Sequence, residues 1–339
     1  MKVALDAQLT IGTATGIGEY VGGLADALEA DGVDVVRLFE SRIDPWRFDR
    51  RVYWDQVLLP QRARASGADV LHCAAGTMPL TLAMPTVATV HDVAWLRVQA
   101  HARPYARYYF GAFSIERYRH AQRIVIDSEF SRAELLDAAP RLEPGRMSVV
   151  YPGVAGDYMR LDRRPGDGRT ILAIGTIERR KNLELLARAL VLLPDARVVA
   201  VGPPTEYADE VLALAHELGV ADRLEMRGYV ERSEVLALYA SAAVVAVPSR
   251  YEGFGYAAAQ ALCAGTPVIV SDRSSLPEVV RGDAPVVPLE LDAWVAALGG
   301  ALQGDLDARA AEARPGSIRR FAWSATAEAM RAVYEGALS

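Results

Sequence analysis

The sequence has few of the residues that build disulfide-rich or zinc-binding domains. Its 339 residues include two cysteines, Cys73 and Cys263, which lie far apart and form no CxxC pair. Cysteines and histidines nowhere cluster with the spacing of a metal site. This scarcity excludes a small disulfide scaffold and a structural zinc domain.

An excess of positive charge and long apolar runs are lacking as well. The 37 lysines and arginines and 43 acidic residues give a formal net charge of −6, which argues against a nucleic-acid binder. No stretch approaches the roughly 18 uncharged apolar residues of a membrane span. The N-terminal MKVALDAQL alternates like a strand and contains Asp6, unlike a secretory signal. We therefore expect a cytoplasmic protein without nucleic-acid partners.

Apolar residues, in contrast, are abundant and form short Val/Ile/Leu-rich runs separated by amphipathic stretches. This alternation is typical of βαβ units, whose parallel strands are covered on both faces. The runs predict strands at residues 2–6, 33–38, 69–72, 86–91, 123–127, 147–150, 170–174, 196–201, 223–226, 243–247 and 267–270. Helices are predicted between them, including 182–193, 205–218, 231–241 and 255–264.

A break in composition separates two series of strands. Residues 152–169 contain two prolines, four glycines and a cluster of charges, which is typical of a linker. We expect an α/β protein with two Rossmann-like, doubly wound domains, residues 1–163 and 164–322, that face each other across a cleft. Ligands of such sheets bind beyond the carboxyl ends of the strands.

The segment 248–272 has the most specific pattern in the chain. A strand ends at Pro248, and the loop Glu252-Gly253-Phe254-Gly255 then opens a helix. Glycines let the backbone approach a ligand, and the free N–H groups of a helix start can hold a phosphate. Because phosphate repels a carboxylate, Glu252 suits sugar hydroxyls better. The alternative is a helix-start charge favoured by the helix dipole.

A second strand-to-helix junction carries three cations. The strand at 170–174 is followed by Gly175 and then by Arg179, Arg180 and Lys181. Cations at such a junction suit a diphosphate. The alternative is a solvated run of charge, which is the commoner fate of such clusters.

Together these segments resemble the donor-site motifs of retaining glycosyltransferase family 4, which has the GT-B fold. The glutamate-x7-glutamate motif of the family matches Glu252 and Gln260, and its G-T-x-x-x-R-K-N variant matches 175–182. Further segments resemble the family in the same order along the chain, namely TGIGEYVGGL (15–24), TVHDVAWL (89–96), SEFSRAEL (128–135), VYPGV (150–154), SSLPEVVRGDA (274–284) and FAWSATA (321–327). The sequence departs from the family at Gln260, where glutamate is usual, and at Thr176, where arginine is frequent.

The resemblance implies roles for individual residues. The first domain would bind the acceptor and the second the nucleotide sugar, and residues 323–339 would form a helix that crosses back to the first domain. The residues implied in catalysis are His91, Arg180, Lys181 and Glu252. Those implied in donor binding are Gly16, Gly18, Thr176, Tyr229, Val230, Gly253, Phe254, Gly255, Tyr256 and Gln260. Gln260 keeps an acceptor oxygen for a ribose hydroxyl but lacks the charge.

The first domain gives weaker signals by itself. Residues 12–18 read GTATGIG, which accommodates a phosphate or a sugar ring, or is an ordinary glycine-rich turn. His91 follows a strand, where a lone histidine is more often structural. Residues 97–123 combine six arginines with six Tyr and Phe residues against one acid, Glu116. This segment predicts contact with an anionic membrane at the inner face of the plasma membrane, a lining of the cleft, or buried aromatics beneath solvated arginines.

The function implied is transfer of a hexose from a nucleotide-diphosphate sugar, such as GDP-mannose or a dTDP- or UDP-sugar, to a glycan or lipid-linked acceptor. The resemblance implies retention of anomeric configuration, and the cations at 180 and 181 would neutralise the leaving diphosphate without a metal or other cofactor. Two rivals stay open at this point. One is a nucleotide-sugar epimerase of the same fold, and the other is an inactive sugar-nucleotide-binding subunit.

Overall fold

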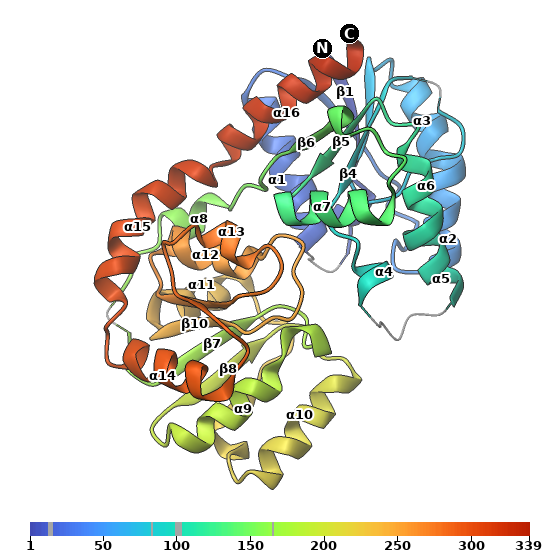
Figure 1. Ribbon diagram of the computed structural model, residues 1–339. Coiled ribbons are helices and arrows are strands. Elements are labelled where there is room, and N and C mark those ends of the chain that lie inside the picture. Colours follow the sequence, from blue (N-terminus) through green and yellow to red (C-terminus); the bar gives the residue numbers. More distant parts are fainter. Residues whose placement is uncertain (13–15, 83, 99–103, 165) are drawn as a thin grey trace. The chain divides into compact units, whose positions relative to one another are not determined.

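The computed structural model describes residues 1–12, 16–82, 84–98, 104–164 and 166–339. The chain divides into two compact units (Figure 1), Met1–Gly153 with Ala322–Ser339 and Val154–Phe321. Residues 154–163, assigned above to the first domain, belong here to the second unit. The sequence-based boundaries at 163 and 322 stay predictions.

In the described residues, unit one contains a parallel sheet of six strands in the order β2-β1-β3-β4-β5-β6. Its strands are β1 (Lys2–Asp6), β2 (Asp34–Leu38), β3 (Val70–Cys73), β4 (Thr86–Val90), β5 (Arg123–Ile126) and β6 (Met147–Val149). Its helices are α1 (Gly16–Ala30), α2 (Phe48–Tyr53), α3 (Leu59–Ala65), α4 (Ala94–Arg97), α5 (Pro104–Tyr108), α6 (Ser114–Tyr118), α7 (Glu129–Ala138) and α16 (Trp323–Leu338).

The described part of unit two repeats this architecture with the order β12-β11-β10-β7-β8-β9. Its strands are β7 (Thr170–Ile174), β8 (Arg197–Val201), β9 (Leu224–Met226), β10 (Val244–Val247), β11 (Val268–Ser271) and β12 (Val286–Val287). Its helices are α8 (Gly156–Met159), α9 (Leu183–Leu192), α10 (Glu206–Glu217), α11 (Arg232–Ser241), α12 (Tyr256–Ala264), α13 (Leu276–Val280), α14 (Leu291–Leu302) and α15 (Asp307–Arg320).

The observed strands confirm the predicted fold class. Each predicted strand overlaps an observed one, and β12 was not predicted because its two residues are too few to give a periodic pattern. Alternate residues of β1 face two different apolar clusters: Val3 and Leu5 pack with α1 and α16, whereas Ala4 packs with α3. Because side chains alternate across a sheet, this arrangement gives the doubly wound cover that near-continuous apolar strands require.

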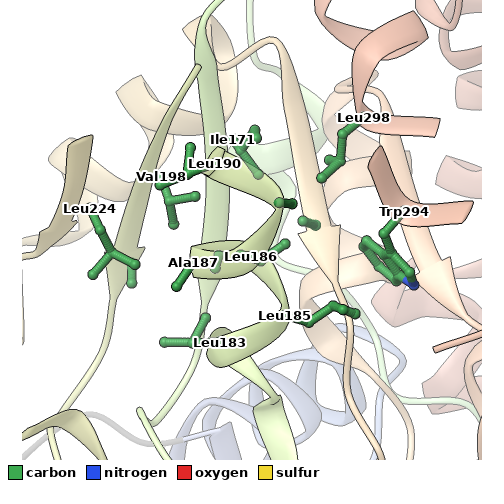
Figure 2. Close-up of a cluster of buried hydrophobic side chains, with 14 of the residues drawn as sticks. Ile171, Leu183, Leu185, Leu186, Ala187, Leu190, Val198, Leu224, Trp294 and Leu298 are labelled. Carbon is green, nitrogen blue, oxygen red and sulfur yellow. The ribbon is translucent and has the colours of Figure 1, made fainter. Parts of the chain in front are cut away.

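The core of unit two is built by α9 against the sheet. Figure 2 shows Leu186 and Leu190 of this helix beside Ile171 of β7, and all three are fully buried. Trp294 and Leu298 of α14 complete the cluster from the side of Leu185. This packing fixes α9, and with it the loop that precedes the helix.

Helix α16 packs within unit one against α1. Its first residue, Trp323, lies so close to Gly23 and Gly153 that a Cβ atom at either glycine would stand 2.3 Å or 2.2 Å from the indole ring. At the other end Tyr334 is fully buried and its hydroxyl lies 2.8 Å from Nδ1 of His72. The last helix is therefore an integral part of the first core.

Candidate active site

The strand order of unit two brings two loops together. From β7 the chain proceeds outward through β8 and β9 on one side, and through β10, β11 and β12 on the other. The loops that leave β7 and β10 consequently meet at the point where the order reverses. This is where ligands bind in doubly wound sheets.

The loop after β7 places the predicted cations. Gly175 has φ +124°, and a Cβ atom there would lie 3.2 Å from Nζ of Lys181, so glycine leaves room for the lysine to cross the strand end. A short turn, Arg179–Lys181, ends at Asn182 in the left-handed conformation. The Asn182 side chain donates a 3.1 Å hydrogen bond to the carbonyl of Pro248, which ties this loop to the one after β10.

Glu252 lies between the two cations. Nζ of Lys181 is 2.6 Å from Oε1 of Glu252, and Nη1 of Arg180 is 2.7 Å from Oε2. The Ser249 hydroxyl donates a further 2.7 Å hydrogen bond to Oε1. The Glu252 residue is 5 % exposed. The structure thus brings three predicted catalytic residues together, 71 and 72 positions apart in sequence.

The charge on Glu252 is strongly favoured. Burial by itself would raise the pKa of Glu252, but the positive charges of Lys181 and Arg180 outweigh burial and lower that pKa to about 2. Burial also lowers the pKa of Lys181 below its ordinary value, despite the opposing effect of Glu252. The site therefore holds a carboxylate whose oxygens both accept charge-assisted bonds from the cations of the β7 loop.

The backbone of the 252–255 loop is fixed from a neighbouring turn. The Ser274 hydroxyl accepts from the Glu252 N–H at 2.9 Å, and the Ser275 hydroxyl donates to the carbonyls of Glu252 and Phe254. Gly255 has φ +100°, and a Cβ atom there would come within 2.7 Å of Leu276. Glycine is therefore required where the loop turns into α12.

The remaining predicted donor residues take different positions in unit two. Oε1 of Gln260, on α12, lies 3.0 Å from the hydroxyl of the buried Tyr239. The Phe254 ring is buried between the rings of Tyr256 and Phe321. Thr176 and Lys181 both line a small cavity of about 20 Å³. Gly253 lies in the loop between Glu252 and Phe254. Tyr229, which is 54 % exposed, and Val230 follow β9.

The predicted residues of unit one lie at strand ends and at a helix start. Gly16 and Gly18 are in the first turn of α1, whereas residues 13–15 of the predicted glycine loop lie outside the described residues. His91 follows β4, and its ring contacts Asp127, which follows the neighbouring strand β5. The ring of Tyr20 packs edge-on against that of His91 at 4.9 Å.

Three residues of these sites were not predicted. Asp127 and Ser249 hydrogen-bond to His91 and Glu252 respectively, and no local pattern distinguishes them from other strand-end polar residues. Gly202 directly follows β8 with φ +147°, and a Cβ atom there would lie 2.1 Å from the carbonyl oxygen of Gly175. For Gly202, its position directly after a predicted strand is the feature of the sequence that could have indicated a role.

Most of the basic, aromatic segment 97–123 is engaged inside unit one. Arg97 pairs with Glu134 and Asp137, and Arg117 donates to the carbonyls of Pro79 and Leu80. Tyr109 and Tyr118 are buried, whereas Tyr105 and Tyr108 are 46 % and 64 % exposed. Residues 99–103, including Arg103, lie outside the described residues.

The described residues hold neither a metal-binding cluster nor a membrane-spanning helix. Their His, Cys, Asp and Glu side chains form no group of three or more that could hold a metal ion. Within the same ranges, no helix combines the length and apolar character needed to cross a membrane.

Two family models match consecutive parts of the chain. The model described as Glycosyltransferase Family 4 matches residues 14–157, and the model described as Glycosyl transferases group 1 matches residues 158–296. The chain therefore belongs to the glycosyltransferase family that these two models together describe. The 158–296 match contains the Arg180, Lys181 and Glu252 cluster, and the 14–157 match contains His91.

Curated relatives of this chain include proteins named D-inositol 3-phosphate glycosyltransferase. The one from Mycolicibacterium gilvum (strain PYR-GCK) is 32 % identical over 235 residues, which is 65 % of this chain and 53 % of the relative. The one from Mycobacterium avium (strain 104) is 31 % identical over 236 residues, or 64 % of this chain and 55 % of the relative. The chain spans about half the length of these relatives.

Solved structures confirm the GT-B fold of this family member. Sucrose-phosphate synthase from Thermosynechococcus elongatus has a TM-score of 0.75 at 21 % identity, with 98 % of each chain covered. Anabaena Alr3699/HepE in complex with UDP-glucose has a TM-score of 0.74 at 14 % identity, with 99 % of this chain and all of that one covered. At such identities the likeness establishes the fold alone.

Proposed function

We propose that the protein transfers a hexose from a nucleotide-diphosphate sugar to a glycan or lipid-linked acceptor, with retention of configuration. The observation that carries the proposal is the cluster of Arg180, Lys181 and Glu252 at the reversal point of a doubly wound sheet. Membership of a glycosyltransferase family supports it, as does the UDP-glucose bound by the structural relative HepE.

In this proposal Arg180 and Lys181 exchange their partner. They pair with Glu252 in the structure, and a diphosphate would compete for the same donors. Glu252 is then free to accept hydrogen bonds from sugar hydroxyls. The two cations neutralise charge on the leaving diphosphate, which is electrostatic stabilisation by groups already in place.

The proposed transfer keeps configuration without a covalent intermediate. With the donor bound, the carboxylate of Glu252 keeps its hydrogen bond from Ser249 and accepts hydrogen bonds from sugar hydroxyls, which lowers its reactivity as a nucleophile. We therefore assign attack to the acceptor hydroxyl on the face from which the diphosphate departs. A phosphate oxygen of the leaving group accepts the proton of that hydroxyl as the new glycosidic bond forms.

A peripheral membrane contact is part of the same proposal. Unit one exposes a group of aromatic side chains, Trp46, Tyr53, Tyr105 and Tyr108, each 45 % exposed or more. Aromatic side chains with polar tips favour the interface of a membrane, where a lipid-linked acceptor would reside. Flotation with anionic and with neutral vesicles tests this contact, and Tyr108→Ser should weaken it. The contact is contradicted if the parent chain floats to the same extent with anionic vesicles, with neutral vesicles and without vesicles.

The transfer itself is tested by incubating the purified chain with UDP-glucose, GDP-mannose and a dTDP-sugar, each with and without acceptor extracts. We expect nucleoside diphosphate to be released with one donor in an acceptor-dependent way, and Lys181→Ala to abolish the release. An epimerase would change the sugar without releasing diphosphate, and an inactive subunit would bind a nucleotide sugar without turnover. Either result would overturn the proposal.

A further inference from the structure

A second pocket of unit two lies beside the Glu252 cluster but uses other side chains. It has a volume of about 560 Å³ and is lined by Asn182, Glu184, Leu185, Arg188, Arg250, Arg273 and Leu289. These residues come from α9, from Asn182 directly before this helix, and from the segments that follow β10, β11 and β12. Three arginines and one glutamate give the lining a clear excess of positive charge.

The acidic residue of helix α9 does not neutralise the charge of Arg188. Glu184 precedes Arg188 by four residues, which is the spacing of a favourable ion pair on a helix. Both carboxylate oxygens of Glu184 are, however, used elsewhere: Oε1 accepts from Arg250 at 2.6 Å, and Oε2 accepts from the Tyr207 hydroxyl. Within the described residues Arg188 consequently makes no side-chain hydrogen bond or ion pair.

The other two arginines have partners that hold them at the rim. Arg250 donates to Asn182 Oδ1 at 2.9 Å as well as to Glu184, and Nε of Arg273 lies 3.1 Å from Asp272. Each guanidinium carries five N–H donors in a planar fork, so these bonds leave further donors for a ligand. Leu185 and Leu289 supply an apolar wall in the same pocket.

We propose that this pocket binds a phosphate group, either as free phosphate or as part of a phosphorylated small molecule, with Arg188 as its principal ligand. Guanidinium groups match the geometry of phosphate oxygens and form charge-assisted hydrogen bonds with them. The backbone N–H of Arg250 donates to the carbonyl of Arg180 at 2.7 Å, so a backbone hydrogen bond links the pocket to the loop that carries the donor cations. The site does not depend on the proposed transferase activity.

The test is calorimetric titration of inorganic phosphate into four versions of the full chain: the parent, Arg188→Gln, Arg319→Gln and Lys181→Ala. Arg319 is an exposed arginine of α15 that does not line the pocket, so its variant controls for loss of one surface charge. Lys181→Ala removes a donor-site cation and separates the two sites. Melting curves of all four establish that they fold, and Arg273→Gln provides a second pocket variant.

We expect Arg188→Gln to bind phosphate about tenfold more weakly than the parent, the loss of one strong charge-assisted interaction. Arg319→Gln should bind like the parent, and Lys181→Ala should keep this binding event. The proposal would be overturned if Arg188→Gln bound phosphate as strongly as Arg319→Gln does. It would also be overturned if Lys181→Ala lost phosphate binding completely. Equal affinity for acetate would overturn the assignment to phosphate.

A titration with glucose 1-phosphate distinguishes the two sources of the ligand. Tighter binding than that of inorganic phosphate, lost in Arg188→Gln, identifies a phosphorylated molecule whose body contacts Leu185 and Leu289. Binding no tighter than that of inorganic phosphate identifies the free ion.

Discussion

The imidazole of His91 is held by the carboxylate of Asp127. Nδ1 of His91 lies 2.7 Å from Oδ2 of Asp127, and Nε2 lies 3.0 Å from the carbonyl oxygen of Ala74. An ionised carboxylate and a carbonyl can accept but not donate, so the ring satisfies both as a doubly protonated imidazolium. Although burial disfavours this charge, the charge of Asp127 and its hydrogen bond raise the pKa of His91 above the ordinary value. The geometry suits His91 to supply positive charge at the end of β4 rather than to accept a proton.

The Asp127–His91 pair predicts a pH-dependent contribution to stability. A raised folded-state pKa stabilises the fold below the unfolded pKa of about 6.5, and this contribution is lost as the pH rises through the folded pKa. The difference in free energy of unfolding between the parent and Asp127→Asn should therefore be largest near pH 5 and shrink above pH 7.

Chemical denaturation of both proteins at a series of pH values measures that difference. Burial lowers the pKa of nearby His72 to about 3, and its own pH dependence is common to both proteins and cancels. Asp92 and Tyr20, the other titratable groups around His91, are also present in both. A difference that stays constant from pH 5 to pH 9 would show that His91 is neutral.

The ion cluster at Glu252 predicts a contrast between two variants. Lys181→Ala leaves Arg180 as a counterion of Glu252, whereas Glu252→Gln removes the carboxylate that both cations share, although Arg180 keeps its ion pair with Glu178. We expect both to reduce turnover by orders of magnitude, and Glu252→Gln to lose more stability, on the order of 3 kcal/mol. Assays with the best donor and urea unfolding of each variant measure the two effects. Turnover near the parent rate in either variant would remove that residue from the donor site.

The same cluster has a signature at low pH. The folded-state pKa of Glu252 is lowered to about 2, so the stability it contributes is present above its unfolded pKa of about 4.3 and is lost as the pH falls toward 2. The stability difference between the parent and Glu252→Gln should therefore narrow between pH 5 and pH 2. An unchanged gap over this range would contradict the ionised, paired state of Glu252.

Gln260 offers a test of the donor site by restoring the residue usual in the family. Its Oε1 lies beside the Tyr239 hydroxyl, which can donate equally to a carboxylate. Since charged acceptors bind hydroxyls more strongly, Gln260→Glu should bind the donor about tenfold more tightly, and Gln260→Ala more weakly. Calorimetry with the nucleotide sugar measures both. Equal affinities for all three proteins would show that position 260 does not contact the donor.

The buried hydrogen bond between Tyr334 and His72 predicts that the last helix stabilises unit one. Tyr334→Phe keeps the ring but leaves a ring nitrogen of the fully buried His72 without its partner. We expect a loss of about 1–3 kcal/mol in the free energy of unfolding. Tyr53→Phe, at a 45 % exposed tyrosine of α2, is the matched control and should be neutral. Equal melting temperatures for the two variants would contradict the role of this bond.

The sequence by itself determined the strands other than β12, the fold class and the two loops that meet at Glu252. Runs of apolar residues locate buried strands such as β7 and β10. Glycines and cations that follow a strand are local patterns, so they can be recognised without knowledge of the fold. The tertiary structure decided which charges meet. Lys181 and Glu252 are 71 residues apart, and their 2.6 Å contact exists because strand order places β7 beside β10.

Residues whose role lies in a single long-range contact could not be read from the sequence. Asp127 and Ser249 become informative when neighbouring strand ends place them against His91 and Glu252. Arg188 is another such case, because its spacing from Glu184 predicts an ion pair that Arg250 and Tyr207 prevent. Local patterns encode which elements form, whereas competition among distant side chains for the same partner is settled in the folded chain alone.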